Sequence, residues 1–157
     1  MADAAGVPIM LTELRLPTIK RLWSDLAARL IVGIVLCMLV NGGIISMSAA
    51  VIPPPAGMNV DDLESIRANA HRFRPKHFVM PFLAHALGSL IGGLAAALIA
   101  ATRKVTFALV IGIVHLLGGI AAAIMIPAPM WFIALDLVVA YVPMSWLGGK
   151  LGGGTKT

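Results

Sequence analysis

Four uninterrupted apolar runs dominate the chain. They extend from Leu30 to Ile52, from Phe78 to Ala101, from Val105 to Ile126 and from Met130 to Leu147. The hydrocarbon core of a bilayer, about 30 Å thick, is crossed by about 20 helical residues, and a helix satisfies its own backbone groups in lipid. The runs lack the alternation of polar and apolar residues that barrel strands show. The pattern therefore predicts an all-α integral membrane bundle of four transmembrane helices.

Helix-breaking residues separate the runs. Residues 53–57 are Pro-Pro-Pro-Ala-Gly, Arg103-Lys104 marks a tight turn, and Pro127-Ala128-Pro129 marks another. Proline lacks the backbone donor and clashes with the preceding turn, so we expect short antiparallel hairpins at the two tight turns. Gly148, Gly149 and the glycines after them are expected to end the fourth helix. The predicted organisation is an N-terminal segment (1–29), a four-helix domain (spans 30–52, 78–101, 105–126 and 130–147, with a loop over 53–77) and a flexible glycine-rich tail (148–157).

The loop over residues 53–77 has an amphipathic pattern of its own. Asn59 can cap a helix, acidic residues fill the first turn and basic residues fill the last. Apolar side chains recur at helical spacing at Leu63, Ile66, Ala70 and Phe73. We expect one amphipathic helix on the outer surface of the membrane, either as an interfacial connector or as a lid over an outward-facing cavity.

Composition and charge narrow the class of protein. Of 157 residues 59% are apolar and 12% are charged, too apolar for a soluble globule or a disordered chain, and one cysteine excludes a disulfide scaffold. Cytoplasmic flanks of membrane helices are enriched in Lys and Arg, and an even number of spans puts both termini on one side. We therefore expect both termini in the cytoplasm, and we attribute the net charge of +5 to this asymmetry and to anionic lipid, without a nucleic-acid partner. The basic residues on that side are Arg15, Lys20, Arg21, Arg29, Arg103, Lys104, Lys150 and Lys156. The opposite side receives Arg67, Arg72, Arg74 and Lys76, which are offset there by Asp61, Asp62 and Glu64.

A secretory signal peptide is the alternative interpretation of the first run. Basic residues precede it, and Ser48-Ala49-Ala50 has the small residues of a cleavage site. The apolar core is longer than the 7–15 residues typical of a signal peptide, and cleavage would leave only three spans.

Small residues form stripes along the second and third helices. The second carries Ala84, Gly88, Gly92, Ala96 and Ala100 at fourfold spacing, and the third carries Gly112, Gly119 and Ala123. Such stripes allow close helix approach, and we expect them to support a homo-oligomer or contact with another membrane subunit. Residues 89–98 and 115–124 also match at six of ten positions. The match is either a vestigial inverted repeat, as transporters have, or shared low complexity.

Five polar residues within the spans are the candidates for chemistry. They are Asn41, His85, His115, Asp136 and Tyr141. At 1.5 Å per residue, His85 and Asp136 lie about 10 Å and 9 Å below the outer ends of their helices, whereas Asn41 and His115 lie about 16 Å deep. We expect His85 and Asp136 to pair, and Asn41 and His115 to form a deeper tier.

Three hypotheses account for these polar residues. They are an interhelical hydrogen-bond clamp, a proton or solute pathway, and haem ligation by His85 and His115. The difference in depth of about 6 Å disfavours haem, so we expect no cofactor. Nor do we expect a metal site or catalytic residues, because hydrolytic and nucleotide-binding motifs are lacking and Ser46, Ser48 and Ser89 have no activating neighbours in sequence. Pro143 predicts a kink in the fourth helix beyond Asp136.

Two resemblances add context. Residues 30–151, with Ile52-Pro-Pro-Pro, Pro81-Phe-Leu-Ala-His-Ala-Leu-Gly and Leu135-Asp-Leu-Val-Val-Ala-Tyr, resemble a family of small bacterial four-helix membrane proteins of unknown function. This resemblance implies a bacterial cytoplasmic (inner) membrane and no particular chemistry. Residues 11–27 resemble the extreme N-terminus of IstB-like transposition helper ATPases, but no Gly-x-x-x-x-Gly-Lys motif follows, so no ATPase activity is implied. We interpret residues 11–27 as a fusion appendage; the alternative is an amphipathic surface helix.

The sequence thus predicts a non-enzymatic structural or accessory membrane subunit, assembled through small-residue helix packing. The alternative is a small transporter or a proton or solute pathway that uses the intramembrane histidines and Asp136.

Overall fold

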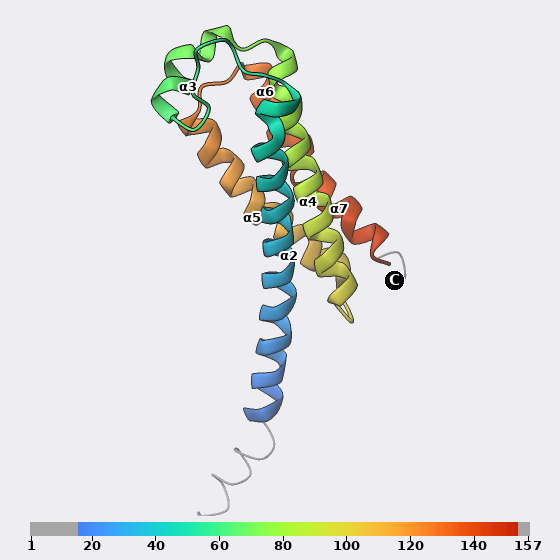
Figure 1. The fold of residues 1–157 in the computed structure, drawn as a ribbon. Helices are drawn as coiled ribbons and strands as arrows, with labels where there is room; N and C mark the ends of the chain where they lie inside the picture. The colour runs from blue at the N-terminus through green and yellow to red at the C-terminus, as the bar shows by residue number, and fades with distance from the viewer. Residues whose placement is uncertain (1–15, 154–157) are drawn as a thin grey trace, which may run out of the picture.

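The structure is a computed structural model that describes residues 16–153, with side chains described from Leu26 onward. The predicted all-α bundle is confirmed (Figure 1). Within residues 16–153, four stretches are long and apolar enough to span a membrane: Leu26–Val51, Pro75–Ile99, Lys104–Met125 and Met130–Leu151. The elements in chain order are α2 (Leu16–Val51), α3 (Leu63–Asn69), η1 (Ala70–Arg72), η2 (Pro75–Phe78), α4 (Val79–Ile99), α5 (Lys104–Met125), α6 (Met130–Leu135), η3 (Asp136–Ala140) and α7 (Val142–Leu151).

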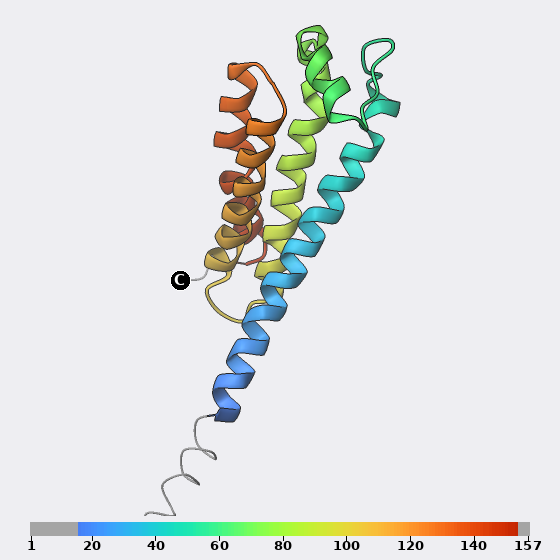
Figure 2. The ribbon, with the colours of Figure 1, turned by 90° about the vertical axis from the view of Figure 1, so that its left-hand side faces the viewer.

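Helix α4 is the centre of the bundle. It packs against α2, α5 and α7, and Figure 2 shows it between α2 on one side and the α5–α7 pair on the other. The connection over residues 52–78 and the α5–α6 turn lie at one end of the bundle, which we call the loop end. The α4–α5 turn and the end of α7 lie at the opposite end, where the Lys104 Nζ atom donates to the Gly152 carbonyl oxygen at 2.9 Å.

The first helix is longer than its apolar run. We predicted a span beginning at Leu30, but α2 begins at Leu16 and continues without a break. Its first turns project beyond the other helices (Figure 1). The segment that resembles the IstB-like N-terminus, residues 11–27, begins outside the described residues. From Leu16 onward its backbone belongs to α2. Pro17 is compatible with this helix because a proline within the first turn leaves the later hydrogen bonds intact.

The predicted tail from residue 148 is wrong for its first four residues. Helix α7 continues through Gly148 and Gly149 to Leu151, and both glycines are buried. A Cβ atom on Gly148 would lie 2.7 Å from the backbone nitrogen of Leu94, and one on Gly149 would lie 2.7 Å from the Ala108 Cβ. These glycines therefore let α7 approach α4 and α5 closely and do not end the helix.

The small-residue stripe of α4 packs inside the chain. Ala84 and Ala96 are fully buried, and Gly88 and Gly92 lie against α2. A Cβ atom on Gly92 would lie 2.6 Å from the Cys37 Cβ. Our prediction of a homo-oligomer or of contact with another membrane subunit depended on this surface. In the structure the surface is covered by the chain's own first helix.

Two glycines of α5, Gly112 and Gly119, face the last transmembrane stretch. A Cβ on Gly112 would collide with the Ser145 hydroxyl, and one on Gly119 would collide with the Tyr141 hydroxyl. Both glycines therefore make room for polar side chains of the last transmembrane stretch, within the same chain.

The loop contains the expected helix, with a different cap. Helix α3 covers only Leu63–Asn69, and its N-cap is Asp62, whose Oδ1 atom accepts a hydrogen bond from the Glu64 backbone nitrogen at 3.0 Å. Asn59 instead accepts from the Asp61 backbone nitrogen at 3.0 Å, so the predicted cap residue shapes the turn before the helix. The helix begins later than predicted because the Asp62 side chain, directly before Leu63, caps its first turn.

Candidate functional site

The last transmembrane stretch changes its helical form beside the polar residues. Between α6 and α7, residues Asp136–Ala140 form a π-helical segment, and Tyr141 has φ −105° and ψ −81°. Pro143, in the first turn of α7, has no N–H to bond back to Val139, and its ring would clash with that carbonyl. The predicted irregularity thus occurs as a π-helical segment just before the proline.

This segment brings Asp136 and Tyr141 to one side of the helix. In an α-helix, two residues five positions apart point about 140° away from each other. Here the Tyr141 hydroxyl donates to Asp136 Oδ2 at 2.9 Å. The π-helical segment therefore builds a contact that an unbroken helix would prevent.

His85 completes an upper polar group with these two residues. Its Nδ1 atom lies 2.9 Å from both Asp136 carboxylate oxygens and 2.8 Å from the Tyr141 hydroxyl. The imidazole also stacks on the Tyr141 ring, with centroids 5.2 Å apart. The Asp136 side chain is 7% exposed and the His85 side chain 18%. Because the carboxylate accepts, Nδ1 carries the proton, and Nε2 of a neutral His85 is a hydrogen-bond acceptor.

His115 forms a lower polar group with Asn41 and Ser89. The Asn41 Nδ2 atom lies 3.1 Å from His115 Nε2, and the Ser89 Oγ atom lies 2.9 Å from His115 Nδ1. The structure therefore forms the expected pair of His85 and Asp136, and Asn41 and His115, which we expected at one deeper level, are hydrogen-bonded to each other. It also adds Ser89, which lies one helical turn after His85 on the same face of α4.

Ser89 has a histidine neighbour that its place in the sequence did not show. We expected it to lack an activating neighbour, yet it contacts a histidine whose second nitrogen is held by an amide. Asn41 Nδ2 can only donate, so Nε2 of His115 accepts and Nδ1 carries the proton toward Ser89. A general base would have to accept the serine's proton, which is the opposite direction. Ser89 is also fully buried, so this trio is structural in the arrangement seen.

The two polar groups touch without a hydrogen bond between them in the described part of the chain. The His115 ring meets the Tyr141 ring edge to face at 5.0 Å and the His85 ring at 5.9 Å. Toward the opposite end lies an apolar core of Cys37, Ala96 and Ile111. The buried Ser145 hydroxyl beside Gly112 donates to the carbonyl oxygen of Val142 at 3.0 Å and does not extend the polar groups. The five predicted residues therefore form two groups in contact, closed below by apolar packing.

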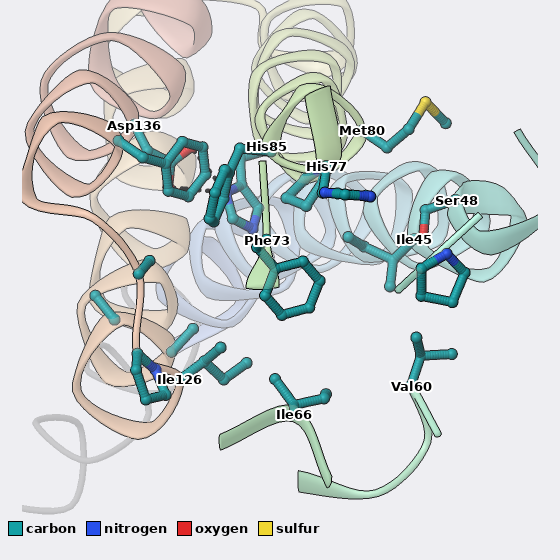
Figure 3. Close-up of a pocket in the computed structure, with 18 of the residues that line it drawn as sticks. Ile45, Ser48, Val60, Ile66, Phe73, His77, Met80, His85, Ile126 and Asp136 are labelled. Carbon is teal, nitrogen blue, oxygen red and sulfur yellow. Dashed lines mark hydrogen bonds and ion pairs between the residues drawn. The ribbon is translucent and has the colours of Figure 1, made fainter. Parts of the chain in front are cut away.

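A cavity of about 360 Å³ opens above the upper group, toward the loop end. Figure 3 shows His85 and Asp136 at its inner side, with Phe73 and Ile66 of the loop across from them. Its walls come from α2, α4, α5 and the stretch from Met130, and they are mostly apolar. They include Ile45, Ala49, Ile52, Met80, Ala122, Ala123, Ile126, Phe132 and Ile133.

The loop covers part of the cavity as a lid. The lid residues that line it include Val60, Ile66, Phe73 and His77. Arg67, on α3, fixes the loop to the bundle because its Nε atom donates to the carbonyl oxygen of Met125 at 2.9 Å, at the end of α5. Of the two alternatives for this helix, the contacts favour the lid.

The polar lining of the cavity is acidic or neutral. Asp136 and Asp61 line it, together with His85, His77, Ser46 and Ser48, and the described lining includes no lysine or arginine. Among the described residues no group of three or more His, Cys, Asp or Glu side chains is arranged to hold a metal ion. Both ring nitrogens of His115 have hydrogen-bond partners, so haem ligation by that residue would require it to give one up.

Sequence reasoning found five of the polar residues and offered a lid over an outward-facing cavity as one of two alternatives for the loop. Depth placed the pairs, and the spacing of His85 and Ser89 could have added the serine. The cavity depends on how the loop folds back over the bundle, which has no local signal. Comparisons with protein-family models, with curated proteins and with solved structures found no match to this chain.

Proposed function

We propose that this chain is a non-enzymatic membrane protein that binds a small, mostly apolar molecule in the cavity beneath the loop. The observation that carries the proposal is the position of His85 and Asp136 at the inner end of a lidded apolar cavity. Binding sites for small molecules are typically 300–1,000 Å³, apolar, and equipped with a few polar groups that orient the ligand. A cavity of about 360 Å³ with one carboxylate–imidazole pair meets each of these criteria.

Two features favour binding over the other functions predicted from the sequence. The stripe of α4, which was to have joined this protein to a partner, is buried against α2. A proton relay through the bundle would need continuous polar contacts, but the hydrogen bonds stop between the two groups and an apolar core follows. A transporter that carries the bound molecule by a change of conformation remains compatible with the cavity.

We further propose that the loop end faces away from the cytoplasm of a bacterial cell, in its inner membrane. Support comes from the basic residues at the opposite end, where Arg103 and Lys104 begin α5 and Lys150 lies in the last turn of α7. Arg29 reaches the same region, since its guanidinium lies 5.4 Å from the Phe107 ring centroid. Basic residues favour the cytoplasmic face, so the cavity would open on the outer side.

The binding proposal is tested by photolabelling in lipid nanodiscs. The probe is 3-trifluoromethyl-3-phenyldiazirine, a small apolar molecule that reacts with nearby side chains on illumination. We expect mass spectrometry to find labels on Ile66 and Phe73 of the lid and on Met80 of α4. We expect the Ala123→Trp variant, which fills the cavity, to lose them.

A matched control lies two residues away on the same helix. Ala121 is exposed and does not line the cavity, so Ala121→Trp adds the same side chain outside it. Labels that survive Ala121→Trp and disappear in Ala123→Trp support the proposal. Equal labelling of the lid in wild type and Ala123→Trp would show that the probe reaches these residues from lipid, and would overturn it.

A further inference from the structure

We infer that the molecule bound in the cavity is a lipophilic amine, bound as its ammonium ion. This inference rests on the proposed binding function and adds the chemical class of the ligand. It depends on three observations that concern charge, free hydrogen-bonding atoms and the shape of the apolar space.

The charge of the cavity favours a cation. Two carboxylates line it, Asp136 at the inner end and Asp61 in the loop, and the described lining holds no Lys or Arg to neutralise them. The groups that face the Asp136 carboxylate within hydrogen-bond distance are His85 and Tyr141, and His115 is the next titratable group, with its ring 5.9 Å from that of His85. The Asp136 carboxylate lies in a mostly apolar space, where an opposite charge is attracted strongly.

The hydrogen-bonding atom of His85 that faces the cavity is Nε2, an acceptor in the neutral imidazole with the proton on Nδ1. The hydrogen bonds that the structure gives His85 all involve Nδ1, and Figure 3 shows the other ring nitrogen turned into the cavity. An ammonium N–H can donate to this Nε2 atom, with the Asp136 charge directly behind the imidazole. The carboxylate would polarise the ring toward the cation, as it does for imidazoles that bind metal ions.

The remaining space suits an apolar body attached to that ammonium group. From His85 the walls are aliphatic and aromatic up to the lid, with Phe73, Phe78 and Phe132 among the lining residues. The Phe78 and Phe132 rings pack together with centroids 4.7 Å apart and add aromatic surface to the lining. A carboxylate ligand would face two acidic side chains, and a neutral ligand would gain nothing from the charge.

The test compares three ligands of nearly equal shape: 4-phenylbutylamine, 4-phenylbutan-1-ol and 4-phenylbutanoic acid. Each is titrated by calorimetry into nanodiscs that contain the full chain, and empty nanodiscs of the same lipid supply the partition background. We expect the amine to bind saturably and at least about tenfold more tightly than the alcohol, and the acid to show no saturable binding. This comparison of three ligands uses the wild-type chain alone, so its result does not depend on whether a variant folds.

Variants assign the preference to the carboxylate. In Asp136→Asn the amine is expected to lose its advantage over the alcohol, because the amide keeps the shape of the side chain and removes its charge. Asp61→Asn, which changes the carboxylate in the loop, is expected to reduce amine binding by a smaller factor. Ala123→Trp should abolish saturable binding of both ligands.

The outcomes separate this inference from the binding function. If the alcohol binds as tightly as the amine and Ala123→Trp displaces both, the cavity binds neutral molecules and the inference is overturned. Tightest binding by the acid overturns it too. If none of the three binds saturably and the lid is not photolabelled, the proposed binding function itself fails.

Discussion

Gly92→Ala is the sharpest test of how the α4 stripe is used. The added Cβ atom would lie 2.6 Å from the Cys37 Cβ and 2.7 Å from the Gly33 carbonyl oxygen, both on α2. Non-bonded heavy atoms are optimally about 3.5–4.0 Å apart, so α2 would have to move away by about 1 Å. Both contacts are at the backbone or the first side-chain atom, so no flexible group can swing aside.

The magnitude follows from a comparison with Gly118→Ala. Gly118 is an exposed helical position on α5, where an added Cβ meets nothing within 4 Å. Alanine gains up to about 1 kcal/mol over glycine in a helix, a gain common to both variants. The difference between them therefore isolates the clash, which we expect to cost about 1–3 kcal/mol of unfolding free energy.

The assay is reversible unfolding in mixed micelles with an increasing SDS fraction, followed by circular dichroism, with cross-linking to monitor the oligomeric state. We expect Gly92→Ala to unfold at a lower SDS fraction than Gly118→Ala, with no change in oligomeric state. If instead the two variants are equally stable and only Gly92→Ala changes the oligomeric state, the stripe joins separate chains and our account of the fold is refuted.

Three further predictions concern the polar groups and the lid. Gly119→Ala should cost about 1–3 kcal/mol in the same unfolding assay, because its Cβ collides with Tyr141; a stability equal to wild type would contradict the packing. Tyr141→Phe should cost about 1.5–3 kcal/mol by removing the hydrogen bond to Asp136, and an unchanged unfolding curve would show that this bond is not formed. Arg67→Ala should change global stability by less than about 1 kcal/mol, yet it should accelerate amide hydrogen exchange across α3, since the bond to Met125 is lost; unchanged exchange would remove this contact as the anchor of the lid.

The sequence predicted the transmembrane helices well and their polar contacts in part. The ends of the four runs agree with the structure to within a few residues, except where α2 extends back to Leu16 and α7 extends on to Leu151. Depth along a helix predicted that His85 would meet Asp136 and that Asn41 would lie level with His115, because depth is a one-dimensional quantity that residue counting supplies. Residue counting does not supply the direction in which a side chain points around the helix axis. For that reason Tyr141 could not be assigned to either group in advance.

Glycine shows the limit of local reasoning most clearly. A run of glycines is typical both of a flexible end and of a surface for close packing. In the structure, Gly148 and Gly149 are packed against α4 and α5. In the same way, the stripe on α4 indicates that some helix approaches closely without indicating which one. The choice between a partner and the chain's own α2 depends on contacts between residues about fifty positions apart.

What the sequence determined by itself was that this chain forms four membrane-spanning helices with a few costly polar residues inside them. It could do so because hydrocarbon thickness and the need to satisfy backbone hydrogen bonds act on each segment separately. The tertiary structure alone decided that the lid folds over a cavity and that the π-helical segment turns Asp136 and Tyr141 toward His85. Both depend on which faces of different helices meet, and no single segment carries that information.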